Sequence, residues 1–314
     1  METRKPIDLS AGGLMLVICM IWGLQQVVIK LAAEDMAPIV QTGLRSGLAA
    51  VLVAALIRIR GGRIVLRDSS WRPGLLAGFL FALEYLFVGE GLRFTTASHM
   101  VVFLYTAPIF TALLLHWRLP EERLKPLQWA GIGLAFTGIV LTFIDRGAAS
   151  TAASAPNMVL GDLFGMAGGL CWGLTNLVLR TSRLAFIPAS NTLLYQLIGA
   201  FVLLSFSTVI LGQTEVRLTA TVVASLSFQV LIISFASFLA WFWLLRHYLA
   251  SRLGVLSFLT PLFGVAFGVL LLNEPLEMNF ILGSLMVLAG VLLVSGYEWI
   301  QHRMAQAHRC GESC

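Results

Sequence analysis

The sequence contains ten apolar stretches, each about 20 residues long, separated by short segments that carry most of the charges. A hydrocarbon layer of about 30 Å requires a helix of about this length. The stretches are continuous rather than alternating, so they predict helices and not strands. We expect ten transmembrane helices near residues 11–32, 37–58, 73–92, 97–116, 126–144, 158–179, 188–211, 221–243, 249–271 and 276–296.

The composition agrees with a chain surrounded by lipid. The chain of 314 residues is 58% hydrophobic and 12% charged, whereas about a quarter of the residues in a soluble domain are charged. We therefore predict an all-α, multi-pass protein of the cell (inner or plasma) membrane, with the lipid bilayer and a small-molecule substrate as its partners. The net charge of +5 does not indicate nucleic acid, because the basic residues are scattered singly and in short loops. We expect a monomer.

The basic residues predict the orientation of the chain. With the N-terminus in the cytoplasm, 16 of the 21 lysines and arginines fall in inside segments and Arg45 lies within a span. The outside segments hold only Lys30, Arg93, Arg146 and Arg217. This bias is what the positive-inside rule requires of ten helices with both termini on the cytoplasmic side.

The two halves of the chain resemble each other. At an offset of 150, the sequence "WGL" at 22–24 matches 172–174, and Pro38 matches Pro188. At an offset of 153, the pairs are Ala97 with Ala250, Ser98 with Ser251, Pro108 with Pro261, and Glu121 with Glu274. Shared apolar composition would rarely keep such matches in order, so we interpret them as a tandem duplication.

The duplication predicts the geometry of the protein. Each half has five helices, so the second half crosses the membrane in the opposite sense to the first. Inverted repeats of this kind are a known transporter construction, with the substrate site between the halves near mid-membrane. The predicted units are a first five-helix repeat at 1–146, a linker at 147–157, a second five-helix repeat at 158–297 and a cytoplasmic tail at 298–314.

Several motifs together resemble a known family. They are "WGL" at 22–24 and 172–174, "YTAPIF" at 105–110, "LTPLFG" at 259–264, and "LPEERL" and "LNEPLE" ahead of the fifth and tenth spans. The chain is similar to the EamA-type ten-helix exporters of the drug/metabolite transporter superfamily, which include the aromatic amino-acid exporters. The resemblance implies export of small metabolites, with neutral and aromatic amino acids as the expected class, by alternating access. Its proton-coupled small multidrug relatives carry a carboxylate in their first helix, whereas residues 14–33 hold no Asp or Glu.

Two charged residues lie at mid-span. A charge at bilayer depth costs about 2.5–3.5 kcal/mol on insertion scales, so it persists mainly where it meets water or a partner. Arg45 and Glu84 lie near the middle of their spans. Either they pair with each other and lock the second and third helices together, or they contact a zwitterionic substrate or a proton. Glu84 would then be the carrier in an alternative function, that of a proton-coupled multidrug or metabolite antiporter.

Polar residues also recur at matching places in the two halves. Gln25 and Gln26 correspond to Thr175 and Asn176, Gln41 to Asn191, and Arg45 to Tyr195. Lipid-facing positions would have no reason to keep this pairing, so we predict a shared polar cavity wall; hydrogen bonding between helices alone is the other interpretation. Further expected cavity residues are Tyr85, Tyr105, Trp172 and Trp241, and the expected hinges are Pro108 and Pro261.

Other classes of protein fit the sequence less well. A membrane enzyme would be expected to show a recognisable catalytic motif, but HExxH, GxSxG and phosphate-loop motifs are absent from the sequence. The histidines His99, His116 and His247 are isolated near span ends. A scaffold or receptor would not explain polar groups that recur between inverted repeats. We therefore expect no enzyme activity, no catalytic residues, no cofactor and no metal site.

Overall fold

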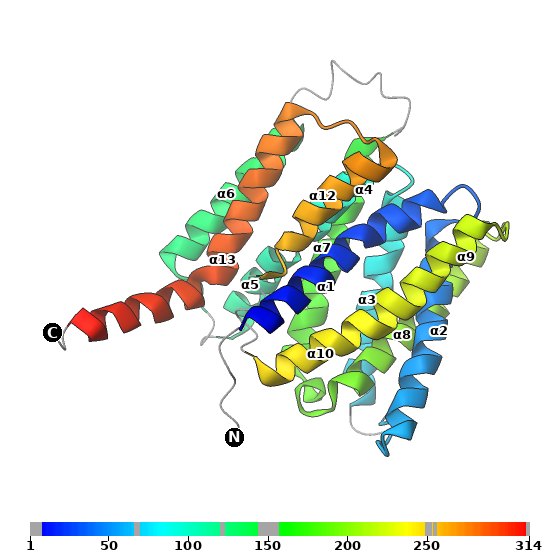
Figure 1. Ribbon diagram of the computed structural model, residues 1–314, viewed down its shortest axis with the longest axis horizontal. Helices are drawn as coiled ribbons and strands as arrows, with labels where there is room; N and C mark the ends of the chain where they lie inside the picture. Colours follow the sequence, from blue (N-terminus) through cyan, green and yellow to red (C-terminus); the bar gives the residue numbers. More distant parts are fainter. Residues whose placement is uncertain are drawn as a thin grey trace.

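The structure is a computed structural model that describes residues 8–65, 70–119, 123–143, 157–248, 253 and 256–311. Regular secondary structure in these residues is helical (Figure 1), as predicted. The helices of the first half are α1 (Leu9–Leu31), α2 (Pro38–Ile59), α3 (Trp71–Gly91), α4 (Ala97–Leu104), α5 (Ala107–Arg118) and α6 (Pro126–Phe143). Those of the second half are α7 (Met158–Thr181), η2 (Arg183–Phe186), α8 (Ala189–Ile210), α9 (Ala220–Ser227), η3 (Phe228–Ser237), α10 (Phe238–His247), α12 (Leu259–Leu272) and α13 (Met278–Gly311).

These helices carry enough apolar sequence for a multi-pass membrane protein. Within the described residues, seven helices or joined helices are long and apolar enough to cross a bilayer, and three shorter apolar helices accompany them. Large apolar side chains such as Val51, Phe206, Val209 and Leu270 are exposed on their outer faces. A soluble protein seldom exposes so many, whereas a protein surrounded by lipid gains from doing so.

The predicted span 97–116 is divided into two helices. The chain turns at Tyr105 and Thr106 between α4 and α5, so Pro108 lies in the first turn of α5. Pro261 is likewise the third residue of α12. We expected both prolines as hinges within the spans 97–116 and 249–271. The structure instead places them at helix starts, where the missing N–H of proline leaves no hydrogen bond unmade.

The predicted span 221–243 also differs from a simple α-helix. It consists of α9, the π-helical segment η3 and α10, which follow one another without a gap. A π-helix of ten residues is unusual, because this form normally occurs as single turns inside α-helices and often near functional sites. The continuous apolar sequence of this span gave no indication of it.

The last helix is longer than predicted. We expected a span at 276–296, but α13 continues as a helix to Gly311. Its C-terminal part extends away from the other helices (Figure 1). The backbone of much of the predicted cytoplasmic tail is therefore helical.

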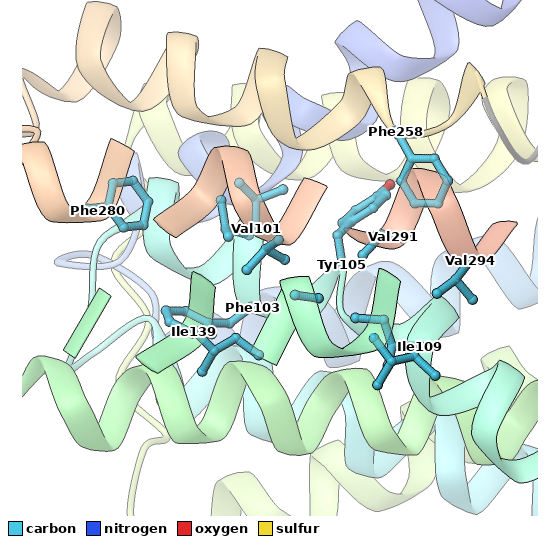
Figure 2. Packing of buried hydrophobic residues seen from close by; sticks show 13 residues of the cluster. Val101, Phe103, Tyr105, Ile109, Ile139, Phe258, Phe280, Val291 and Val294 are labelled. Carbon is cyan, nitrogen blue, oxygen red and sulfur yellow. The ribbon is translucent and has the colours of Figure 1, made fainter. Parts of the chain in front are cut away.

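The two halves pack directly against each other. The α6–α13, α3–α7, α2–α8, α3–α8 and α1–α12 pairs make the most extensive helix contacts, and each pair joins one half to the other. Buried apolar side chains of α4, α5, α6 and α13, together with Phe258, form one cluster across the halves (Figure 2). The α3–α8 crossing is especially close, because Gly78 lies against Gly199. The core is therefore shared between the halves.

A contact between the halves also fixes the start of α1. The Asp8 carboxylate accepts hydrogen bonds from Ala11 N at 2.8 Å and Ser10 Oγ at 2.7 Å, which caps the helix. It also accepts a hydrogen bond from Tyr248 Oη at 2.8 Å, at the end of α10. Because these bonds favour the charged carboxylate, they lower the pKa of Asp8 to about 2.

Candidate functional site

A cavity of about 540 Å³ lies between the two halves. Its wall is built from α1, α3, α4 and Tyr105 of the first half, and from α7, η2, α8, α10 and Ser257 of the second. Volumes of about 300–1,000 Å³ are typical of small-molecule sites. The cavity is therefore large enough for a metabolite.

Nine of the thirteen predicted cavity residues line this space. They are Gln25, Gln26, Glu84, Tyr85, Tyr105, Trp172, Thr175, Asn176 and Trp241. Their polar groups are partly engaged already: Asn176 Nδ2 donates to Thr111 Oγ1 at 3.2 Å, and Thr175 Oγ1 donates to the Cys171 carbonyl at 2.9 Å. The duplicated polar positions of α1 and α7 thus line the same cavity.

Gln41, Arg45, Asn191 and Tyr195 lie outside the cavity wall. Gln41 Nε2 donates to the Ile29 and Met36 carbonyls at 3.0 and 2.8 Å, and its Oε1 accepts from Gln229 Nε2 at 2.9 Å. These bonds join α2 to the end of α1 and to η3. The interpretation of hydrogen bonding between segments describes Gln41 better than a place in the wall.

Asn191 and Tyr195 support neighbouring segments in the same way. Asn191 Oδ1 accepts from Val65 N at 2.9 Å, and its Nδ2 donates to the Arg63 carbonyl at 3.3 Å. Tyr195 packs against Gly74 of α3, where a Cβ atom would lie 2.6 Å from the ring. Both residues are buried: the Asn191 amide holds the start of α8 to the chain before α3, and the Tyr195 ring packs the same helix against α3.

Arg45 and Glu84 do not form the ion pair that we considered. Within the described residues, no salt bridge joins them, although both side chains are buried. The Arg45 guanidinium instead lies over the Tyr85 ring, 4.5 Å from its centroid. A cation–π contact therefore links α2 to α3, and the Glu84 carboxylate remains without this partner.

The wall also contains aromatic residues that we did not predict. Phe81, Phe238 and Trp22 line the cavity, although they were not among the expected cavity residues. Trp22 Nε1 donates to Ser237 Oγ at 2.8 Å, and its ring lies 5.5 Å from that of Trp241 in an edge-to-face arrangement. The recurrence of Trp-Gly-Leu in both halves was the sequence signal for this place.

A second aromatic pair in the cavity wall likewise joins one residue of each half. The Tyr105 and Trp172 rings are edge-to-face, with centroids 5.4 Å apart. The turn between α4 and α5 brings Tyr105 to this position. Such pairs give the wall rigid apolar surfaces that accept a flat ligand.

The cavity reaches the molecular surface at one end. The wall there is formed by η2 and the start of α8, and it includes the exposed residues Ala185 and Ala189. At the opposite end, Val101 of α4 forms part of the wall and is buried. A ligand can therefore enter from the end at η2, which we call the open end.

The opposite, sealed end is closed by a carboxylate of the second half. Glu274, in the segment between α12 and α13, accepts from Ala97 N at 2.7 Å, Ser98 N at 2.9 Å and Ser98 Oγ at 2.6 Å. It thereby caps the N-terminus of α4, a favourable place for a negative charge. Ser98 lies three residues, or about 4.5 Å along the helix, beyond Val101. The seal therefore adjoins the inner limit of the cavity.

Two further contacts strengthen the sealed end. Asp162 of α7 accepts from Thr95 Oγ1 at 2.6 Å, and its Oδ2 lies 3.0 Å from His99 Nδ1. Lys30 Nζ, at the end of α1, donates to the Thr95 carbonyl. We had interpreted His99 as isolated, and we had not singled out Asp162 at all. The reason is that the two residues belong to different halves and meet only in the folded protein.

Comparisons with known proteins agree with these observations. The model of the EamA-like transporter family matches residues 9–144 and again residues 159–296. An uncharacterized transporter YoaV of Bacillus subtilis is 25% identical over 283 residues, which cover 88% of this chain and 93% of the relative. A probable amino-acid metabolite efflux pump of Escherichia coli is 26% identical over 304 residues, or 92% of this chain and 96% of the relative.

Two more comparisons concern the location and the fold. An uncharacterized inner membrane transporter YedA of Escherichia coli is 31% identical over 136 residues, which cover 41% of this chain and 42% of the relative. A crystal structure at 19% identity covers 91% of this chain and 97% of its own, with a TM-score of 0.63, and shows the fold alone. The predicted family resemblance and the membrane location are confirmed: this chain belongs to the EamA-like transporter family of membrane proteins.

Proposed function

We propose that this protein is a secondary transporter that exports small amphipathic metabolites, with neutral and aromatic amino acids as the first class to test. Two relatives are named probable amino-acid metabolite efflux pumps, which supports this class. The cavity wall combines aromatic rings with a few polar groups, which suits a substrate with an apolar body. The nine predicted wall residues that line the cavity would contact it.

The same proposal includes the inverted topology. The two family matches support a first repeat at 1–146 and a second at 158–297, joined by a linker at 147–157 and followed by a tail at 298–314. Seven long and three shorter apolar segments in the described residues support ten spans. The distribution of basic residues supports cytoplasmic N- and C-termini. In this orientation the open end of the cavity faces the cytoplasm.

One observation carries the proposal: a cavity between the two halves is open at one end and sealed at the other. The seal consists of contacts between the halves, with Glu274 on α4 and Asp162 on Thr95 and His99. Releasing these contacts, and closing the cavity at η2, would expose the same residues to the other side. Alternating access requires a site of this kind.

Exchange in vesicles tests the proposal. The purified protein is reconstituted into vesicles, and uptake of radiolabelled phenylalanine, tryptophan, leucine and alanine is measured against the same unlabelled solute inside. We expect saturable exchange of at least one amino acid, with competition among similar substrates. Uptake equal to that of protein-free vesicles for every amino acid and metabolite tried would contradict the proposal.

A second candidate function is a proton-coupled multidrug or metabolite antiporter. Among the described residues that line the cavity, Glu84 alone is charged, and Glu84 Oε2 is buried without a hydrogen-bond partner. A carboxyl group in this position can exchange a proton with the cavity. The absence of Asp and Glu from residues 14–33 distinguishes this arrangement from that of the small multidrug relatives.

Glu84→Gln separates the two functions. If Glu84 carries the proton, the variant keeps downhill flux but loses the dependence of flux on a pH gradient across the vesicle membrane. Wild-type and variant protein that respond identically to the gradient would leave facilitated diffusion as the mechanism. Flux is normalised to the amount of monodisperse protein reconstituted.

A hinge at Pro108 gives a further prediction. Pro108 lies at the start of α5, just after the turn at Tyr105 and Thr106. Alanine supplies the missing N–H and favours a continuous α4–α5 helix, which would stiffen this turn. We expect Pro108→Ala to slow exchange several-fold while the thermal midpoint changes little. Exchange rates per folded molecule equal to those of the wild type would contradict this role, and Pro261→Ala is the matched variant in the second half.

A further inference from the structure

The cavity wall carries charge of one sign, together with buried acceptor atoms that have no hydrogen-bond partner. Within the described part of the chain, the wall contains no Lys, Arg or His, and Glu84 is its only charged residue. Glu84 is 6% exposed and its Oε2 is without a hydrogen-bond partner. Gln26 is 3% exposed, and its Oε1 is likewise without a partner. The wall thus offers two unsatisfied acceptors from two helices, α1 and α3.

Three donor side chains of the wall are already occupied, and the remaining donors, such as those of Gln25, Trp172 and Trp241, are neutral. Asn176 donates to Thr111, Thr175 donates to the carbonyl one turn before it, and Trp22 donates to Ser237. These donors are therefore not free to bind a carboxylate without losing a partner. Since a buried acceptor without a partner is costly, a ligand that donates hydrogen bonds to Glu84 and Gln26 is favoured over one that cannot.

The nearby cation does not change this character. Arg45 lies over Tyr85 and is 1% exposed, and it is not part of the wall. Its guanidinium is therefore not accessible to a ligand in the cavity. A negatively charged group of a ligand therefore finds no exposed positive charge in the described wall.

The rings of the wall favour the same ligand. Trp22, Tyr105, Trp172 and Trp241 surround the cavity in two edge-to-face pairs. Aromatic faces attract cations and pack against flat apolar groups. A protonated amine attached to an aromatic or apolar body satisfies both the acceptors and the rings.

We propose that the cavity recognises its substrates through a protonated amine, held by the Glu84 carboxylate and the Gln26 carbonyl oxygen, and that an α-carboxylate on the substrate contributes little. This inference rests on the proposed function only in taking the cavity as the substrate site. It extends the substrate class from amino acids to amines that carry an aromatic or apolar body.

Three ligands that share one ring test the proposal: phenethylamine, phenylalanine and 3-phenylpropionate. Binding to the purified full-length protein in lipid nanodiscs is measured by titration calorimetry at pH 7. We expect the dissociation constant of phenethylamine to exceed that of phenylalanine by no more than about threefold. We expect the dissociation constant of 3-phenylpropionate to be at least about tenfold higher than that of phenethylamine, because one charge-assisted hydrogen bond accounts for about that factor. Equal binding of 3-phenylpropionate and phenethylamine, or no binding of phenethylamine, would overturn the proposal.

Variants assign the preference to the named groups. In Glu84→Gln we expect the affinity for phenethylamine to fall to that for 3-phenylpropionate, and in Gln26→Met we expect a smaller loss of the same sign. Glu90→Gln is the matched control on α3, because Glu90 is paired with Arg93 and Gln213 and lies outside the cavity. Retention of the full amine preference in Glu84→Gln would overturn the assignment; if this variant does not fold, the ligand series on the wild type and Gln26→Met decide.

The outcome is separable from that of the vesicle experiment. Exchange of aromatic amino acids that phenethylamine does not inhibit would overturn the amine proposal and leave the transport proposal standing. The predicted binding series without any exchange in vesicles would support the amine proposal and contradict the transport proposal.

Discussion

Glu274→Gln is expected to open the sealed end of the cavity and to shift the protein toward a state accessible from the outer side. The Glu274 carboxylate accepts three hydrogen bonds from Ala97 and Ser98 through both of its oxygens. Glutamine has the same shape, but it keeps only one acceptor oxygen and turns an NH₂ group toward donors. Because a hydrogen bond to a charged group contributes about 1.5–3 kcal/mol, the loss of one shifts the balance between closed and open states about tenfold or more.

Amide hydrogen exchange at the start of α4 measures this shift toward the open state. The amides of Ala97 and Ser98 are themselves donors to Glu274, so peptides that cover the start of α4 should exchange about tenfold faster or more in the variant. Glu277→Gln is the matched control, because Glu277 is exposed in the same segment. Unchanged exchange at the start of α4 in Glu274→Gln, or an equal increase in Glu277→Gln, would show that the carboxylate does not hold the seal.

Gly199→Ala is expected to destabilise the folded protein strongly at the α3–α8 crossing. A Cβ atom on Gly199 would lie 2.6–2.7 Å from the backbone atoms of Gly78. No side chain can move away, since the obstacle is the main chain of the facing helix, and the two helices must separate. Overpacking of this kind costs about 1–3 kcal/mol.

The loss of monodisperse protein on heating in detergent measures this effect. The matched control is Gly133→Ala on α6, where a Cβ atom would meet nothing within 4 Å. There we expect no loss, and a gain of up to about 1 kcal/mol from helix propensity. Equal thermal midpoints for the two variants would mean that the α3–α8 approach does not limit stability.

The positions of the spans could be predicted from the sequence, but the breaks and the π-helical segment within them could not. Length and apolar composition predicted α1, α2, α3, α7 and α8 to within a few residues, because a bilayer sets both. The division of 97–116 and the π-helical segment η3 depend on how neighbouring helices pack, and an apolar run is compatible with any of these forms. The end of α13 was set too early because the prediction followed apolarity, whereas a helix needs only residues that favour helical backbone.

The site shows the same division. Recurrence between the halves identified α1 and α7 as cavity helices, since Gln25, Gln26, Thr175 and Asn176 all line the cavity. The same recurrence did not predict that Gln41 and Asn191 lie outside the cavity wall. These residues bond to backbone groups of adjacent segments, and no periodicity in the sequence encodes such partners. The sequence contained one sign of the contact between Glu274 and the start of α4: Ala97, Ser98 and Glu274 each have a matching residue in the other half. Those matching residues, Ala250, Ser251 and Glu121, lie outside the described residues.

Distances across both ends of the cavity, measured with and without substrate, test alternating access most directly. Spin labels at Arg93 and Asn273, both exposed, span the sealed end, and labels at Gly13 and Ala185, also exposed, span the open end between the halves. Saturating substrate that exchanges in vesicles should populate a state in which the 93–273 distance lengthens while the 13–185 distance shortens. If both distances keep their substrate-free distributions while exchange proceeds, the two halves do not open in turn around one site.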